Sequence, residues 1–405
     1  MLKGIVFLII NGLYFLSIYT NSLIAQAIPD IEWDAAFTRT EGWTGGDAAG
    51  SVDLGNGRTL WMFADSWIGG VAEGKHAPGS HMINNAIAVH DSSFLGNCRV
   101  PRYKDISFYW GPADKKGKPT AWIIPEIEPE KTWYWFNGSG VVIPSPEGQN
   151  RLVMFLFKLT TRGEEGSAWN FQGIGSAMAI VDNFTVPPDK WKVRQVEIPY
   201  GAGFSSQPGD SLVRITNWGV STWLPEGGIE NESERRLYIY GIDDTNPWDK
   251  HLLLARVKPE DIEKLDMWEY YAGEKEWSSG MDDAISIAGG MVSELSVDEY
   301  SENGKMTLIL TQSEPMFGKR ILVRTASNPE GPWSDPEPVY TVPGLDRGKD
   351  YFTYAAKGHL HLSCNGELLI SYIINSNSFW DMAGDASIYR PRFVRVPVEI
   401  FLPGH

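Results

Sequence analysis

The feature that most constrains the fold is a loose repeat of paired short strands along the whole chain. Each unit has a small or polar strand, a turn, and then a strongly apolar strand that ends in a polar residue. The clearest unit runs from Asp47, through the turn Gly55-Asn56-Gly57, to Asp65. Short runs of β-branched and aromatic residues, separated by glycine, proline, asparagine and aspartate, are typical of all-β proteins.

Five such units can be aligned, and most are followed by a third strand. Their apolar strands are residues 59–65, 152–158, 237–243, 306–312 and 368–375. Five units of about four strands each predict a five-bladed β-propeller, in which the first strand of each blade lines a central channel. A two-sheet sandwich is the competing architecture, but the comparable hairpins favour radial repetition. Residues 259–265 form the one helix-like stretch of note, and we expect one or two turns there.

The N-terminus has the pattern of a cleavable signal peptide. Lys3 precedes an apolar run that extends to about residue 18, and Ala25-Gln26-Ala27 supplies a small-x-small cleavage site. The run is short for a membrane span, and no later stretch is apolar enough to be one. We therefore expect a signal peptide at residues 1–27, one mature domain at residues 28–405, and a secreted or periplasmic location. An uncleaved anchor is the alternative.

Charge and cysteine content limit the classes of partner and cofactor that this chain can have. The chain has 51 Asp and Glu residues against 35 Lys and Arg, which argues against nucleic acid or an anionic membrane as partner. Cys98 and Cys364 could pair in an oxidising compartment, or both could be free, buried thiols. The cysteines and the seven histidines show no zinc spacing, so the sequence requires no cofactor or metal, although oxygen groups could hold a structural calcium ion.

Aromatic residues are abundant, with 17 Trp, 16 Tyr and 17 Phe. Flat rings suit the C–H faces of sugars, but they also fill the cores of β-sheets. We expect most rings in the core and a few in a binding site, with Trp43 and Trp67 beside the first hairpin as the candidates for substrate binding.

The first hairpin predicts a pair of facing acids. If its turn is centred on Asn56, residues equally distant from Asn56 face each other, and Asp47 and Asp65 are such a pair. Directly opposed like charges lower the stability of the fold, so a reason for keeping this pair is needed. The functional explanation is that the pKa values of paired carboxylates separate, so that one is an acid and the other a base. Glycosidic cleavage requires such a pair. The structural explanation is that Asp47 caps the preceding turn while Asp65 bonds backbone.

Equivalent blades would bring the matching positions of the other units to the same channel mouth. These positions are Ser139 with Lys158, Ser221 with Asp243, Glu294 with Gln312, and His359 with Asn375. Nearly all are polar, which suits a polyhydroxylated ligand. We expect Glu294 to be a third acid at the site, and the sugar-binding residues to be Lys158, Asp243, Gln312, His359 and Asn375. The alternatives are a salt bridge from Glu294 to Lys158 or Arg324, and a histidine held by core hydrogen bonds.

The ends of the domain resemble a known group of proteins. Thr44-Gly45-Gly46-Asp47, followed by residues 57–66, is similar to the opening of secreted bacterial five-bladed propellers catalogued as domains of unknown function of the 4185 and 5005 types. The closing segments 354–359, 370–375 and 389–393 resemble the same group. Ala64 replaces the glycine that usually precedes the second aspartate, and Gly358-His359-Leu360 replaces a commoner Ala-His-Pro.

One branch of that group is glycoside hydrolase family 183, whose members are endo-acting arabinan hydrolases. Paired aspartates in their opening blade are implicated in catalysis, so the resemblance implies that Asp47 and Asp65 are the catalytic pair here. The resulting expectation is a secreted glycoside hydrolase that cleaves a polysaccharide or oligosaccharide, arabinan being one candidate. The alternatives are a non-catalytic glycan-binding propeller and a polysaccharide lyase, for which Lys158, Arg324 or His359 would supply a cation or base.

Overall fold

The computed structural model describes residues 26–91, 93–95, 98–161, 170–199, 214–225, 234–348 and 350–402. The signal peptide expected at residues 1–27 lies almost wholly outside the described residues, and so does the side chain of Cys98. Cys364 is disulfide-bonded, which favours the paired state, but the pairing with Cys98 stays a prediction. In the described part of the chain, no helix has the length and apolar character needed to cross a membrane.

The strands form a series of antiparallel sheets in chain order. The first contains β3 (Gly50–Gly55), β4 (Arg58–Phe63), β8 (Ala86–Asp91) and β11 (Ile106–Tyr109). The second contains β12 (Thr132–Pro144), β13 (Asn150–Thr161), β14 (Phe171–Val181) and β15 (Val193–Ile198). The third contains β16 (Thr216–Trp223), β17 (Leu237–Asp243), β18 (Lys250–Val257), β19 (Glu269–Gly273), β20 (Glu276–Ser278) and β21 (Ala288–Met291).

The fourth sheet contains β22 (Leu295–Glu302), β23 (Lys305–Ser313), β24 (Arg320–Ala326) and β25 (Glu337–Thr341). The last contains β26 (Tyr351–Gly358), β27 (Glu367–Ser376), β28 (Pro391–Pro397) and β1 (Ile28–Pro29). Apart from this series, a small sheet holds β2 (Glu41–Gly46), β5 (Ser66–Ala72), β6 (Lys75–His76) and β7 (His81–Ile83), and a separate pair is β9 (Ser93–Leu95) with β10 (Cys98–Val100).

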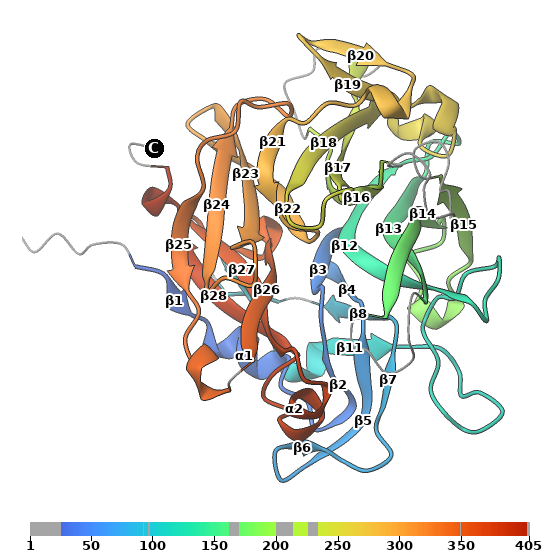
Figure 1. Ribbon diagram of the computed structural model, residues 1–405, viewed down its shortest axis with the longest axis vertical. Coiled ribbons are helices and arrows are strands. Elements are labelled where there is room, and N and C mark those ends of the chain that lie inside the picture. The colour runs from blue at the N-terminus through green and yellow to red at the C-terminus, as the bar shows by residue number, and fades with distance from the viewer. Residues whose placement is uncertain are drawn as a thin grey trace, which may run out of the picture.

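The sheets are arranged radially. Figure 1 shows the first strands β3, β12, β16, β22 and β26 around the centre of the molecule, with the later strands of each sheet farther out. Successive first strands contact one another, from β3 to β12, β16, β22 and β26. The chain is therefore all-β, as the sequence predicts, and its radial arrangement resembles a β-propeller rather than a two-sheet sandwich.

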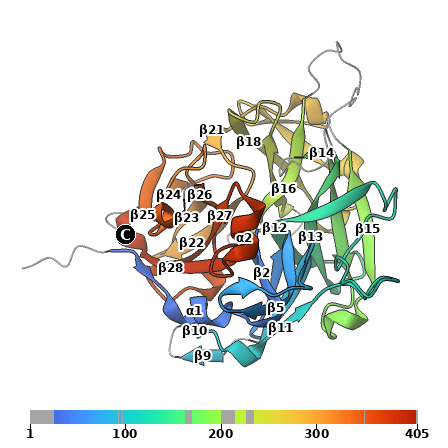
Figure 2. The same cartoon turned by 60° about the horizontal axis from the view of Figure 1, so that its bottom comes forward.

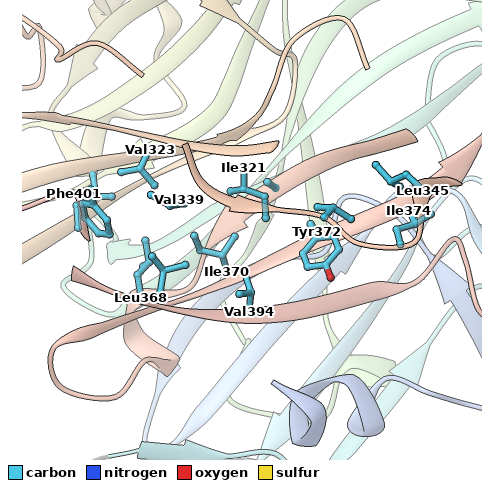
Figure 3. Close-up of a cluster of buried hydrophobic side chains, with 14 of the residues drawn as sticks. Ile321, Val323, Val339, Leu345, Leu368, Ile370, Tyr372, Ile374, Val394 and Phe401 are labelled. Atoms are coloured by element: carbon cyan, nitrogen blue, oxygen red, sulfur yellow. The ribbon is translucent and has the colours of Figure 1, made fainter. Parts of the chain in front are cut away.

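Each sheet packs on its neighbours through apolar clusters on both of its faces. In β23, Leu308 and Leu310 pack towards the preceding sheet, whereas Ile309 packs towards the following one. Figure 3 shows part of this second cluster, where Ile321 from β24 faces Ile370 from β27. Successive strand residues point to opposite faces, so a strand buried on both faces reads as a continuous apolar run. That is why residues 306–312 show no alternation.

The last sheet packs on the first and brings the two ends of the chain together. Phe393 of β28 contacts the rings of Trp33, Phe37 and Trp61, at centroid distances of 5.3, 5.4 and 5.8 Å. The N-terminal strand β1 pairs with β28, with Ile28 opposite Arg395. Contacts between residues near both ends of the chain therefore close the ring of sheets.

Helices are short and lie at the edges of the sheets. Asp30 caps α1 (Ile31–Ala36) by accepting hydrogen bonds from the backbone N–H groups of Glu32 and Trp33, both at 3.0 Å. The second helix, α2 (Phe379–Gly384), follows β27 and lies beside β2 in both views (Figure 1, Figure 2). Single 3₁₀ turns occupy residues 103–105, 188–190, 259–261, 265–267, 281–283, 345–347, 360–362 and 398–400. The helical turns expected at residues 259–265 are confirmed, whereas α1 and α2 were not expected.

Replacing Phe393 with alanine tests the closing cluster. Phe393 is fully buried among aromatic rings, so Phe393→Ala should lower the free energy of unfolding by about 3–5 kcal/mol, measured by urea denaturation. Ile285→Ala, at a side chain that is 43% exposed, is the control and should change stability little. Equal effects of the two substitutions would contradict the role of this cluster in closing the ring.

Candidate active site

The hairpin that carries Asp47 and Asp65 is interrupted at these two residues. On one side of the interruption β2 pairs with β5, and on the other side β3 pairs with β4. Residues equally distant from the turn are paired on both sides: Gly46 with Ser66, and Gly50 with Met62. At the interruption itself, the Asp47 backbone N–H donates to the Asp65 carbonyl oxygen at 3.2 Å. The backbone therefore places the two aspartates opposite each other, in the register that the sequence predicts.

The turn and one bulge together set this register. Asn56 and Gly57 have φ angles of 53° and 76°, as a two-residue hairpin turn requires. The turn alone would centre the pairing between these two residues, and a register shift between Asp53 and Gly55 moves the centre to Asn56. The interruption carries strain of its own, because Ala48 and Ala49 have φ angles of 64° and 47°, a region that costs energy for residues other than glycine. Strain held next to a pair of acids is typical of functional sites.

Other first strands are irregular in the same way. Register shifts interrupt β12 between Phe136 and Gly140, β16 between Trp218 and Ser221, and β26 between Tyr354 and Lys357. Such bulges re-aim the side chains beside them. As a result, residues from separate sheets meet Asp47 and Asp65.

Two tyrosines hold one oxygen of Asp47. The hydroxyl groups of Tyr354 and Tyr389 donate to Asp47 Oδ2 at 2.6 and 3.0 Å. The other oxygen, Oδ1, is buried and has no hydrogen-bond partner among the residues that the structure describes. Burial raises the pKa of Asp47 well above its ordinary value, the carboxyls of Asp65 and Glu294 raise it further, and the tyrosine hydrogen bonds oppose both effects. This carboxyl therefore tends to hold a proton.

Asp65 has a different environment. Trp135 Nε1 donates to Asp65 Oδ1 at 2.7 Å, and the Asn84 side chain also hydrogen-bonds to this carboxyl. Burial raises the pKa of Asp65 to about 7, while the hydrogen bonds from Trp135 and Asn84 act in the opposite direction. Because the acids interact, they titrate as a unit, and near neutral pH the cluster holds at least one proton.

Glu294 is the third acid of the cluster, at the start of the fourth sheet. Burial raises the pKa of Glu294, and the positive charges of Lys357 and Lys250 lower it. The cations that face Glu294 are therefore these two lysines rather than Lys158 or Arg324, the partners considered from the sequence. Lys250 is itself paired with Asp244 at 2.7 Å.

The two tryptophans expected to bind substrate are packed in apolar clusters. Trp43 is 1% exposed and stacks on Phe108 with a centroid distance of 4.5 Å. Trp67 is 4% exposed and stacks on His76 at 4.4 Å. Sequence reasoning did not separate these rings from exposed ones, because core and binding-site tryptophans have the same local pattern.

Two of the charged residues expected to bind sugar are in ion pairs. Lys158 pairs with Glu197, and Asp243 pairs with Arg214 at 2.7 Å. Burial raises the pKa of Asp243, but hydrogen bonds from Thr245 and Arg214 outweigh it, so that pKa is lowered overall. Neither residue is joined to Asp47 or Asp65.

Of the remaining expected residues, Asn375 reaches the cluster indirectly. Its side-chain N–H donates to the Tyr354 hydroxyl at 3.3 Å, and so it orients the tyrosine that holds Asp47. Gln312 donates to the Gly290 carbonyl oxygen at 2.9 Å. His359 lies 2.6 Å from Ser51 Oγ and 2.8 Å from Ser371 Oγ, and burial lowers its pKa well below the ordinary value. His359 is thus a neutral core histidine, the alternative that the sequence left open.

A cavity of about 240 Å³ is lined by Asn84, Thr120, Thr132 and Trp133 among others. Asn84, which hydrogen-bonds to Asp65, is its one link to the acids. In the part of the chain that the structure describes, no three His, Cys, Asp or Glu side chains are placed to hold a metal ion.

A family model named DUF5005, a domain of unknown function, matches residues 30–398. The chain belongs to the DUF5005 family. The match includes the interrupted hairpin and the closing sheet, and it confirms the resemblance to the 5005 type. The narrower resemblance to glycoside hydrolase family 183 stays a prediction. No curated protein sequence matches this DUF5005 member.

Solved structures with a similar fold are distant in sequence. A provisionally named hydrolase from Bacteroides ovatus is 20% identical, with a TM-score of 0.68 over 93% of this chain and 92% of that one. The catalytic domain of a Coprinopsis cinerea GH62 α-L-arabinofuranosidase is 12% identical, with a TM-score of 0.42 over 88% and 92%. An exo-1,5-α-L-arabinanase from a bovine ruminal metagenomic library is also 12% identical, with a TM-score of 0.39 over 88% and 94%. The first similarity shows a shared fold, and none of them identifies a substrate.

Several residues of this DUF5005 site were not expected from the sequence. They are Tyr354, Tyr389 and Lys357, together with Trp135 and Asn84 on Asp65. The first three lie in the closing motifs 354–359 and 389–393, so the motifs themselves were the available signal. No local pattern relates Trp135 to Asp65, because the contact joins two different sheets.

Stability should depend on pH through Asp65. Its pKa is about 7 in the folded protein against 3.8 for the free side chain, so the folded state binds the proton more tightly and loses stability as pH rises from about 4 through 7. Each pKa unit corresponds to about 1.4 kcal/mol. Asp65→Asn should therefore raise the melting temperature more at pH 8 than at pH 4, measured by calorimetry. Asp266→Asn, at an exposed residue, should show no such trend, and a pH-independent effect of Asp65→Asn would contradict the raised pKa.

Proposed function

We propose that this protein is a glycoside hydrolase in which Asp47 and Asp65 form the catalytic acid and base pair. The observation that carries the proposal is their placement opposite each other in different environments. Burial raises the pKa of both carboxyls, and the charges of Asp65 and Glu294 raise that of Asp47 further. A coupled pair that shares one proton supplies the acid and the ionised carboxylate that glycosidic cleavage requires.

The contacts favour one assignment of roles. Both hydrogen bonds from the tyrosines go to Asp47 Oδ2, which leaves Oδ1 to carry the proton that is donated to the departing glycosidic oxygen. The Asp65 carboxylate, which Trp135 orients, then accepts a proton from a water molecule. That water attacks the sugar carbon whose C–O bond was cleaved and forms a new C–O bond there. The proton lost by Asp47 leaves with the alcohol product, and the proton released by the water restores the acid form of the pair.

We further propose that the ring of sheets is a five-bladed propeller and that the protein acts outside the cytoplasm after cleavage of the expected signal peptide. Support for the blade number comes from the five meandering sheets and the apolar cluster at each junction. Arabinan is one candidate substrate, on the strength of the resemblance to family 183.

The lyase alternative has less support from the contacts. Lys158 is paired with Glu197, Arg324 donates to the carbonyl oxygens of Gly289 and Ser334, and His359 is neutral and buried. None of the three is left available to neutralise a uronic acid. A non-catalytic glycan-binding protein remains the second candidate, because two aromatic rings, Phe317 and Trp380, are exposed in this part of the molecule.

Those rings lie on loops at the same end of the propeller as the acids. The first strands begin at that end, and so each second strand returns to it. The turn after β23 carries Phe317, which packs on Phe352 at 4.6 Å, and Phe352 in turn contacts Tyr354 at 5.6 Å. The helix α2 after β27 carries Trp380, which is 80% exposed. We propose that Phe317 and Trp380 stack on sugar units of a bound chain.

Substitution of either aspartate tests the catalytic assignment. Asp47→Asn and Asp65→Asn each remove a proton-transfer group, so each should lower kcat by at least about 100-fold. The measurement is product release from a panel of glycans, arabinans included, by the purified mature protein. Asp266→Asn is the matched control and should keep full activity. Full activity of both site variants would refute this pair, and a wild type that binds glycans but releases nothing would establish the binding function instead.

Loss of the ring at position 380 tests the binding surface. Trp380→Ala should weaken stacking by about 1 kcal/mol and raise KM for a polysaccharide roughly fivefold, while kcat for a short substrate stays unchanged. Met267→Ala, at a side chain exposed at the opposite end of the propeller, is the control. Unchanged KM for long and short substrates would remove Trp380 from the proposed surface.

A further inference from the structure

A buried lysine crosses the centre of the molecule beside the acid cluster. Lys357 is 1% exposed and lies directly after the bulge in β26. Its Nζ donates to the Asn137 carbonyl oxygen of β12 at 3.3 Å. Burying an ammonium group away from water costs free energy unless hydrogen bonds or opposite charges offset it. A buried lysine at this position therefore indicates a function for its charge.

The lysine occupies a slot that glycine creates. A Cβ atom at Gly138 would lie 2.4 Å from Lys357 Cε and 3.1 Å from Nζ, so any side chain there would displace the lysine. Gly138 has a φ angle of 77°, which also suits glycine. The neighbouring strand is equally close, because a Cβ at Gly50 would lie 1.9 Å from the Gly138 carbonyl oxygen. These contacts fix where the ammonium group is held.

The charges around Lys357 are mainly acidic. Glu294 and Asp47 both act on it electrostatically, and both favour its charged form, against the effect of burial. In turn, the charge of Lys357 lowers the pKa of Glu294 and the pKa of the neutral His359. Lys250 also faces Glu294 but is occupied by Asp244 and by Ser293 Oγ, the latter at 2.5 Å. Tyr354 and Tyr389 face Asp47 from the closing sheet.

We propose that Lys357 is a positioning residue, held in the Gly138 slot, whose ammonium charge keeps Glu294 ionised beside Asp47 and thereby confines one shared proton to the Asp47–Asp65 pair. This role rests on the proposed hydrolase function and adds to it a control of the charge state. Without the lysine, three mutually repelling carboxyls would take up a second proton, and the ionised base would be lost at a higher pH than in the wild type.

Removing the charge should move the pH profile of the enzyme. In Lys357→Met the acidic limb of kcat against pH should shift upward by about one pH unit, which lowers kcat at pH 6 about tenfold while KM changes little. Lys357→Arg keeps the charge, so its acidic limb should lie closer to the wild-type position than that of Lys357→Met. A structural role alone would lower the melting temperature without moving the limb, and an unshifted limb in a folded Lys357→Met protein would overturn the proposal.

A second variant tests the same role with the lysine in place. Gly138→Ala should push the Lys357 side chain aside and shift the acidic limb in the same direction. Gly148→Ala is the matched control, because Gly148 has a φ angle of 79° but no atom within 4 Å of a Cβ placed there. Gly148→Ala imposes the same backbone strain without displacing Lys357. An equal shift of the acidic limb in both variants would therefore contradict the role of the Gly138 slot.

The charge control can also be measured without turnover. Carboxyl ¹³C chemical shifts of Asp47, Asp65 and Glu294, followed against pH, should show a higher titration midpoint for Glu294 in Lys357→Met than in the wild type. Equal midpoints would overturn the role of Lys357 even in an active enzyme. A wild type without hydrolase activity but with the expected midpoints would instead refute the proposed function and leave the charge control standing.

Discussion

Burial of both faces of every sheet is the constraint on which the rest of this structure depends. A sheet that is apolar on both faces needs a neighbour on each side, and an open row of such sheets would leave two apolar faces in water. Closing the row into a ring removes both faces. The closing junction is rich in aromatic rings, with Trp33, Phe37, Trp61 and Phe393 in mutual contact, and the rings bury a large apolar area at this point.

The ring also determines the site. Because the first strands converge and begin at one end, residues far apart in the sequence meet there, among them Asp47, Trp135, Glu294 and Tyr354. Bringing three carboxyls together in a buried place is unfavourable, and the cluster is tolerated because hydrogen bonds and lysine charges from other sheets offset part of the repulsion. The packing of the ring supplies the remaining stability, so the chemistry of the site is separated from the interactions that hold the fold together.

Local signals in the sequence predicted the part of the site that lies within one hairpin. The turn at Asn56 and Gly57 connects β3 with β4, and a bulge between Asp53 and Gly55 shifts the pairing into the register in which Asp47 faces Asp65. Counting outward from Asn56 gives the same register. Equivalence between blades was a weaker guide. Bulges in β12, β16 and β26 shift the register within those sheets, so positions matched by counting, such as Lys158 and His359, have structural partners instead. Tyr354 and Lys357 flank one of these bulges, which hydrophobic periodicity does not reveal.

The strand β1 has a consequence for how the chain can fold. Residues 28 and 29 pair with residues 395 and 394, so the last sheet contains the first and the last strands of the propeller. Synthesis from the N-terminus leaves this sheet incomplete until nearly the whole chain exists. Until residues 394 and 395 are present, β1 has no partner strand and the ring stays open. The order in which the sheets are made therefore places ring closure last among the folding steps.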